Sequence, residues 1–194
     1  GYRFHTWLIA PREVGVVDGF RVTTVERTLQ DLMCLTDRLS AVAAVDAALH
    51  RGLVEPATVR RLAETTRRRR GAARSRPWWA EADGRAESPL ETRVRLRAVD
   101  GGYPPDELQL RFDLHPGAAY VDLAWRLPSG GWLAVEADGA TWHDVPDAVY
   151  ADRRRGNALA ARGDVVVVRV VWRDTVSPSY VPHLLARHLG PPAP

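Results

Sequence analysis

Two consecutive stretches with the pattern of β-strands, residues 119–127 and 132–138, constrain the fold of this chain most strongly. A Pro-Ser-Gly-Gly turn joins them, and the second stretch is apolar on both faces, as expected for a central, covered strand. Asp122 lies on the first strand. Glu136 and Asp138 lie on the second, two residues apart and therefore on one face, roughly 7 Å from each other. The sequence thus predicts three carboxylates at one end of a buried sheet.

Carboxylates this close repel one another, and a protein tolerates them when a divalent cation or a retained proton neutralises the charge. Hard oxygen ligands favour Mg²⁺ or Mn²⁺ over zinc. Such an ion polarises a phosphodiester and lowers the pKa of a bound water. The alternative is that some of these carboxylates are solvated residues at strand ends, because Asp138-Gly139 is also an ordinary turn signal.

The residues after the second strand add candidates for this site. His143 is a candidate general base, since an imidazole titrates near pH 7, although an isolated loop histidine often has no such role. Asp152 and Arg155 share one face of a helix predicted at residues 147–161. They either point towards the carboxylates or form a surface pair.

A further pair of carboxylates begins the helix predicted from residues 87–89. Glu87 and Glu91 stand four residues apart, where like charges are mildly destabilising, so one of them is expected to face a counter-charge. Arg95, four residues after Glu91, is the simplest partner.

The second half of the chain predicts the element order α-β-β-β-α-β-α. The helices are expected at 87–99, 147–161 and 179–189, and the strands at 107–114, 119–127, 132–138 and 165–171.

The first 70 residues predict a strand-like run at 3–9, a hairpin turning at Asp18-Gly19, and three helices. Thr24 and Ser40 are the expected N-caps of the first two helices, and the third runs from residue 55 to about residue 69. Four arginines end this third helix: Arg67, Arg68, Arg69 and Arg70. They form either a solvated helix end or a phosphate-contacting patch.

Composition excludes several mechanisms. All 27 basic residues are arginine, so no lysine can form a Schiff base or polarise a phosphate. Cys34 is the only cysteine, which excludes an intramolecular disulfide. The formal net charge of +3 weakly favours a nucleic-acid partner. No run has the length of a membrane span and no signal peptide is visible, so we expect a cytoplasmic protein without membrane contact. The abrupt, strand-like start suggests a piece of a longer protein.

Five motifs carry a resemblance to a known family: ESPLE (87–91), VDLAW (121–125), VEADGATWH (135–143), DRRRGNAL (152–159) and GDVVVVRV (163–170). The element order, with Asp on the second strand and Glu-x-Asp on the third, resembles the restriction-endonuclease-like PD-(D/E)xK superfamily. Within it, the motifs are most similar to the small nuclease domain of very-short-patch-repair (Vsr) endonucleases, across about residues 86–189.

This resemblance implies a role for each matching residue. Asp122 would be the main metal ligand, Glu136 and Asp138 would occupy the Glu-x-Lys positions, Glu91 or Glu87 would be the helix carboxylate, and His143 the catalytic base. Asp152 and Arg155 would match an Asp and an Arg of the family's following helix. Asp138 stands where the superfamily has lysine, which leaves the role of that lysine to His143 or Arg155.

Residues 1–70 resemble actinobacterial proteins related to the AbiEi abortive-infection antitoxin, on the match VDGFRVTTVERTLQDL (17–32). We therefore expect an α/β (α+β) protein with three parts. These are a small, mostly helical N-terminal subdomain at 1–70, a linker at 71–85, and a restriction-endonuclease-like αβββαβ domain at 86–190.

The expected function is a Mg²⁺- or Mn²⁺-dependent DNA endonuclease, a hydrolase of DNA repair or phage defence. Its phosphate contacts would come from the arginine run at 67–70 and from Arg153 and Arg155. The alternative is a catalytically inactive DNA-binding or antitoxin-like regulator with a partner protein in a toxin–antitoxin or defence system. A purely structural or partner-binding role is the third option.

Overall fold

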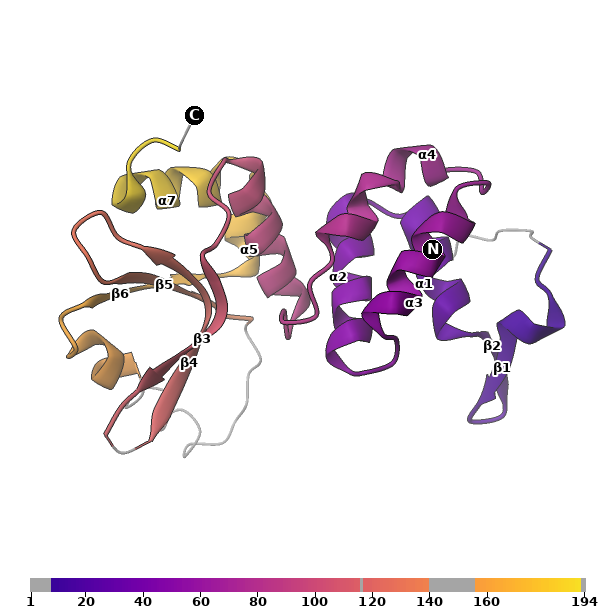
Figure 1. Cartoon of the computed structure of the whole chain (residues 1–194), viewed down its shortest axis with the longest axis horizontal. Helices are drawn as coiled ribbons and strands as arrows, with labels where there is room; N and C mark the ends of the chain where they lie inside the picture. Colours follow the sequence, from indigo (N-terminus) through magenta and orange to yellow (C-terminus); the bar gives the residue numbers. More distant parts are fainter. Residues whose placement is uncertain (1–7, 116, 140–155, 193–194) are drawn as a thin grey trace. The chain divides into compact units, whose positions relative to one another are not determined.

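A computed structural model describes residues 8–115, 117–139 and 156–192, and the chain divides into two compact units, Gly1–Gly84 and Arg85–Pro194 (Figure 1). Each unit is described by itself. The predicted run at 3–9 and the predicted helix at 147–161 lie largely outside the described residues. Of their described parts, residues 8 and 9 have no regular structure and residues 156–160 are helical.

The first unit begins with the short 3-10 helix η1 (Pro11–Glu13) and a hairpin of β1 (Val14–Val17) and β2 (Phe20–Thr23). Asp18 and Gly19 form the turn with φ of 50° and 81°, the left-handed conformation that Asp and Gly tolerate well. The predicted hairpin is thus confirmed.

Three helices follow the hairpin: α1 (Val25–Leu35), α2 (Arg38–His50) and α3 (Pro56–Thr66). Thr24 caps α1 as predicted, because its hydroxyl accepts a hydrogen bond from the Arg27 amide at 3.3 Å. Ser40 was the wrong cap for α2. Asp37 takes that position, and its carboxylate accepts bonds from the Ser40 amide and hydroxyl at 3.1 and 2.7 Å. An Asp side chain caps a helix as well as Ser does, so the N-cap of α2 lies three residues earlier than the sequence suggested.

The segment predicted as a linker, residues 71–85, is largely part of the first unit. It forms α4 (Ala72–Ser75) and the 3-10 helix η2 (Pro77–Glu81). Trp78 and Trp79 are only 9% and 6% exposed, so they anchor this segment in the core. Its Gly, Pro and Arg content indicated a loop, but the two buried indoles decide its packing.

The second unit contains a four-stranded sheet in the order β3 (Glu107–Asp113), β4 (Ala118–Arg126), β5 (Trp132–Ala137) and β6 (Val165–Val170). β4 is antiparallel to both β3 and β5, and β6 is parallel to β5. The helix α5 (Pro89–Asp100) precedes the sheet, whereas η3 (Trp172–Thr175) and α7 (Tyr180–Leu189) follow it (Figure 1). The prediction of a mixed α/β protein is confirmed.

Both faces of the sheet are covered. Residues of α5 and α7 pack with Leu123, Leu133 and Val135 on one face. On the other face, Leu159 of the short helical stretch packs with Val121 and Ala134. The predicted central strand is therefore buried on both sides. No helix in the described part of the chain is long and apolar enough to cross a bilayer.

Candidate functional site

A change of strand face at Gln109 creates the candidate site. Leu108 belongs to the core beneath α5 and α7, whereas Leu110 packs with the core on the opposite face. Side chains two residues apart normally share a face. The rotation coincides with a φ of +53° at Gln109, a left-handed conformation that is uncommon for a residue other than glycine and costs about 1–3 kcal/mol.

The neighbouring strand changes face at Asp122. Val121 belongs to the core on the Leu159 side, and Leu123 to the core beneath α5 and α7. The register pairs Leu108 with Leu123 and Leu110 with Val121, so that Gln109 and Asp122 stand opposite each other. The regular pairing therefore breaks where the predicted metal ligand lies.

Where the regular pairing of β4 with β5 ends, the Asp122 side chain accepts the hydrogen bond of a β5 amide in place of a backbone carbonyl. Of the described residues, the β4–β5 ladder ends at the pair Leu123 and Val135. Beyond it, Oδ2 of Asp122 accepts a hydrogen bond from the Ala137 amide at 2.7 Å. The carboxylate thus joins β4 to the end of β5.

Burial raises the pKa of Asp122 to about 6. The hydrogen bond from the Ala137 amide lowers this pKa, whereas the neighbouring charges of Glu91 and Glu136 raise it further, and a bond from the Gln109 side chain opposes them. Asp122 is therefore largely ionised at pH 7 but stands among groups that disfavour its charge. Such shifts are common at functional sites.

Glu91 approaches from the first turn of α5, where Ser88 caps the helix by accepting the Glu91 amide at 3.2 Å. Glu91 is only 7% exposed. Its Oε2 accepts bonds from the Glu87 amide at 2.8 Å and from Nε2 of Gln109 at 2.9 Å. The Glu87 side chain is exposed.

Gln109 therefore bridges the helix carboxylate and the strand carboxylate. It had no role in the sequence prediction, because it reads as one of the polar residues that alternate with leucines in residues 107–114. Only its backbone conformation reveals that it points into the site.

A second residue without a predicted role, Arg169, supplies the positive charge. The parallel register pairs Arg169 with Glu136, and Nε of Arg169 donates to Oε2 of Glu136 at 3.1 Å. Arg169 is 45% exposed and Glu136 12% exposed. An arginine within an otherwise all-valine strand was the available signal. The cation beside the carboxylates thus comes from β6, at a site where no lysine exists.

Asp138 follows the last residue of β5. It is exposed beyond the end of β5, and its amide donates to the Val170 carbonyl at 2.9 Å. The predicted residues His143, Asp152, Arg153 and Arg155 lie outside the described residues.

The arginine run of the first unit does not act as one patch. Arg67, Arg68 and Arg70 are exposed, whereas Arg69 turns inward and forms ion pairs with Glu13 and Asp31.

The donor chemistry fits a hard divalent cation with a hydrated shell. No group of three or more His, Cys, Asp or Glu side chains within the described ranges is arranged as a metal site. Mg²⁺, however, usually keeps several waters and takes only one or two carboxylates. Asp122 and Glu136 supply that number, and a cation beside Asp122 would offset the repulsion that raises its pKa.

Comparisons with known proteins give relatives without a stated activity. The chain is similar to "Uncharacterized protein MT2308" of Mycobacterium tuberculosis strain CDC 1551 / Oshkosh and to "Uncharacterized protein Rv2248" of strain H37Rv. Each is 34% identical over 153 residues, which are 78% of this chain and 55% of the relative. The chain thus spans about half the length of the curated relatives it matches. No family model and no solved structure matches the chain.

Proposed function

We propose that the second unit is a restriction-endonuclease-like, Vsr-like domain that hydrolyses DNA phosphodiesters with Mg²⁺ or Mn²⁺. The observation that carries this proposal is the placement of Asp122. Its carboxylate lies at a break between two strands, beside two further carboxylates, with a pKa of about 6. The resemblance of the five sequence motifs to Vsr endonucleases supports the same function. A role in DNA repair or phage defence, and a cytoplasmic location, belong to the proposal.

Each residue of the site has a distinct task in this proposal. Asp122 and Glu136 hold the ion, which when bound would polarise the phosphodiester and lower the pKa of a water. Gln109 keeps Glu91 and Asp122 at a fixed separation. Arg169 lies beside Glu136 and can face a phosphate oxygen, the contact that the superfamily makes with lysine.

The remaining predicted residues complete the proposal. His143 would serve as the base, and Asp138 would stand in the lysine position of the motif. Phosphate contacts come from Arg67 and Arg68, two exposed arginines of the run at 67–70, and from Arg153 and Arg155, with Asp152 in support.

The test is nicking of supercoiled plasmid by the whole chain with Mg²⁺ or Mn²⁺. Asp122→Ala should reduce the rate at least about a hundredfold, because loss of a metal ligand removes several kcal/mol of transition-state stabilisation. Asp113→Ala is the matched control. Asp113 lies on the adjacent β3 and is 79% exposed; its carboxylate pairs with the exposed Arg111, and its backbone carbonyl accepts a bond from Arg162. A wild-type protein that leaves every DNA form intact would overturn the enzymatic proposal.

One observation favours the second candidate, a catalytically inactive DNA-binding or antitoxin-like regulator. Glu136 already has a counter-charge in Arg169, so the described site can stand without an ion. This candidate predicts DNA binding that weakens steeply with salt and is unchanged by a chelator or by Asp122→Ala. A metal requirement for binding would contradict it. Its partner would be a protein of a toxin–antitoxin or defence system.

A further inference from the structure

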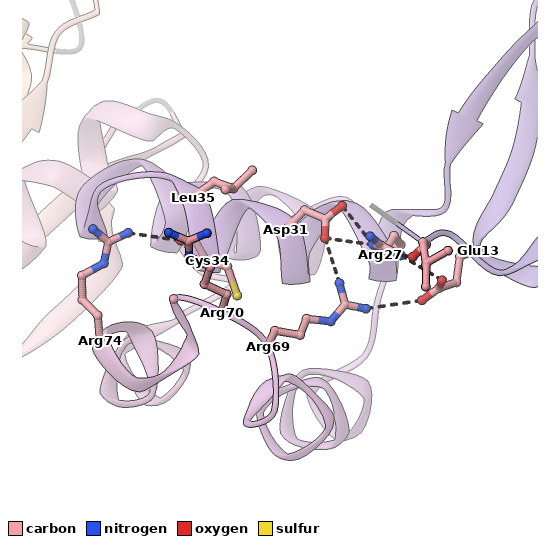
Figure 2. Close-up of a pocket in the computed structure, with 10 residues that line it drawn as sticks. Glu13, Arg27, Asp31, Cys34, Leu35, Arg69, Arg70 and Arg74 are labelled. Atoms are coloured by element: carbon pink, nitrogen blue, oxygen red, sulfur yellow. Dashed lines mark hydrogen bonds and ion pairs between the residues drawn. The ribbon is translucent and has the colours of Figure 1, made fainter. Parts of the chain in front are cut away.

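The first unit contains a cavity of about 1010 Å³, at the upper end of the size range of small-molecule sites. It lies along α1 and the turn that precedes α4 (Figure 2). The charged residues that line it are Glu13, Arg27, Asp31, Arg69, Arg70 and Arg74. Leu8, Cys34, Leu35 and Gly71 line the rest.

One end of the cavity is a closed ring of two guanidiniums and two carboxylates. Arg27 binds Glu13 at 2.9 Å and Asp31 at 2.8 Å. Arg69 binds the same two carboxylates at 3.3 and 2.8 Å. The charges of this end cancel, and Arg27 is 4% exposed, so the ring is a structural element of the unit.

The other end carries positive charge without a carboxylate. Arg74 donates to the carbonyls of Cys34 and Thr36 at 3.3 and 2.9 Å and lies over the Trp78 ring at 5.3 Å. These partners hold its position but leave its charge uncompensated. Within the part of the chain that the structure describes, Arg70 forms no hydrogen bond or ion pair. Four guanidiniums against two carboxylates thus leave two positive charges on the lining.

A glycine fixes the position of both arginines. Gly71 has φ of +92°, and a Cβ there would lie 2.5 Å from the Cys34 carbonyl oxygen. Only glycine allows the chain to pass this close to the end of α1. Arg70 and Arg74 consequently lie at the Cys34 end of the cavity, and Arg69 lies at the Glu13 end (Figure 2).

We propose that this cavity binds a small phosphate monoester with an apolar or planar body, the chemistry of a mononucleotide. The planar forks of Arg70 and Arg74 match phosphate oxygens, and guanidinium–phosphate bonds are among the stronger hydrogen bonds. Cys34 and Leu35 supply an apolar wall beside them. Burial raises the pKa of the Cys34 thiol, so the thiol is uncharged at neutral pH and does not repel the phosphate. This site is independent of the carboxylates of the second unit.

The experiment is calorimetric titration of the whole chain with adenosine 5′-monophosphate at low ionic strength. Arg70→Gln should weaken binding about tenfold, the effect of losing one hydrogen bond to a charged group. Arg70 is exposed, so this variant keeps the fold. Arg60→Gln is the matched control, because Arg60 is an exposed arginine of α3 in the same unit that does not line the cavity, and the affinity of this variant should equal that of the wild type. Adenosine should bind at least tenfold more weakly than the monophosphate.

Three results would overturn the proposal: no heat of binding at millimolar nucleotide, equal losses in Arg70→Gln and Arg60→Gln, or equal affinities for adenosine and its monophosphate. A single-stranded oligonucleotide without a terminal phosphate is the last arm. If it binds with the same dependence on Arg70, the ligand is a nucleic-acid backbone and the small-molecule proposal fails. Plasmid nicking is measured separately, so neither proposal depends on the result of the other.

Discussion

The two units treat buried charge in opposite ways. In the first unit, Glu13 and Asp31 each face two guanidiniums, and the carboxylates are matched by cations. In the second unit, Asp122 lies beside Glu91 and Glu136, and Arg169 forms an ion pair with Glu136. A matched cluster holds a fold together, whereas an unmatched one leaves charge for a ligand to neutralise.

Protonation shows the same contrast. A backbone hydrogen bond from Ala10, aided by the charges of Arg27 and Arg69, lowers the pKa of Glu13 below its ordinary value. Burial raises the pKa of Asp122 to about 6. The first unit therefore loses the stability that Glu13 contributes only as the pH falls below about 4.5, whereas the second unit gains stability between about pH 6 and pH 4, as Asp122 takes up a proton.

The largest expected effect comes from breaking the matched cluster. Arg27→Ala leaves Glu13 and Asp31 with one cation between them and should lower the free energy of unfolding of the first unit by about 3–5 kcal/mol. Arg61→Ala is the control, because the Arg61–Glu26 pair has a similar 2.7 Å distance but both side chains are about half exposed. Its loss should stay below about 1 kcal/mol. Urea unfolding followed by hydrogen exchange in α1 measures both, and equal losses would remove the contrast between the units.

A smaller effect of opposite sign is expected in the unmatched cluster. The folded pKa of Asp122, about 6, lies above its ordinary value of 3.8, so the stability linked to its proton is fully present below about pH 4. That stability is lost as the pH rises through about 6. Asp122→Asn keeps an oxygen for the Ala137 amide and removes the charge, so the second unit should become about 3 kcal/mol more stable at pH 8.

The pH dependence is the control within the same pair of proteins. At pH 4 the wild type and Asp122→Asn should have equal free energies of unfolding, because both side chains are then neutral. If Asp122→Asn is less stable than the wild type at pH 8, the charge of Asp122 is already compensated by a neighbouring group, and the contrast between the two units fails. The amide exchange rates of Leu123 and Val135, both in the core beside this residue, measure the second unit by itself.

Strand order and the central strand were predictable because they follow from local patterns. The run of valines at 165–168 predicts a strand, and the Pro-Ser-Gly-Gly turn at 128–131 marks where the central strand begins. The observed β5 and β6 each end one residue before the predicted bound. The cap of α2 and the packing of Trp78 and Trp79 were not predictable in this way. Several local signals compete there, and tertiary burial selects among them.

In the candidate site, too, the residues that follow from a local pattern were predicted, and those that depend on tertiary structure were not. A strand pattern was enough to single out Asp122 and Glu136, because carboxylates at the end of an apolar strand are unusual. Gln109 and Arg169 were missed, since their contribution depends on a rotated backbone and on a register between strands that are 33 residues apart at the contact. A periodicity of two describes a regular strand, and this site lies where the strands stop being regular.

The smallest prediction tests whether the rotated backbone at Gln109 is a strained feature of the unmatched site. Gln109→Gly and Gln109→Ala both remove the amide that bridges Glu91 and Asp122, but only glycine adopts a φ of +53° without cost. The glycine variant should therefore be about 1 kcal/mol more stable than the alanine variant, by urea unfolding of the second unit. Because neither variant can bridge the carboxylates, both should lose nicking activity to the same extent. If alanine is as stable as glycine, the backbone at this position relaxes and the face change is not held in place by strain. If Gln109→Gly keeps full nicking activity, the Gln109 side chain has no part in positioning Asp122, and the hydrogen bond from the Ala137 amide is enough to hold that carboxylate.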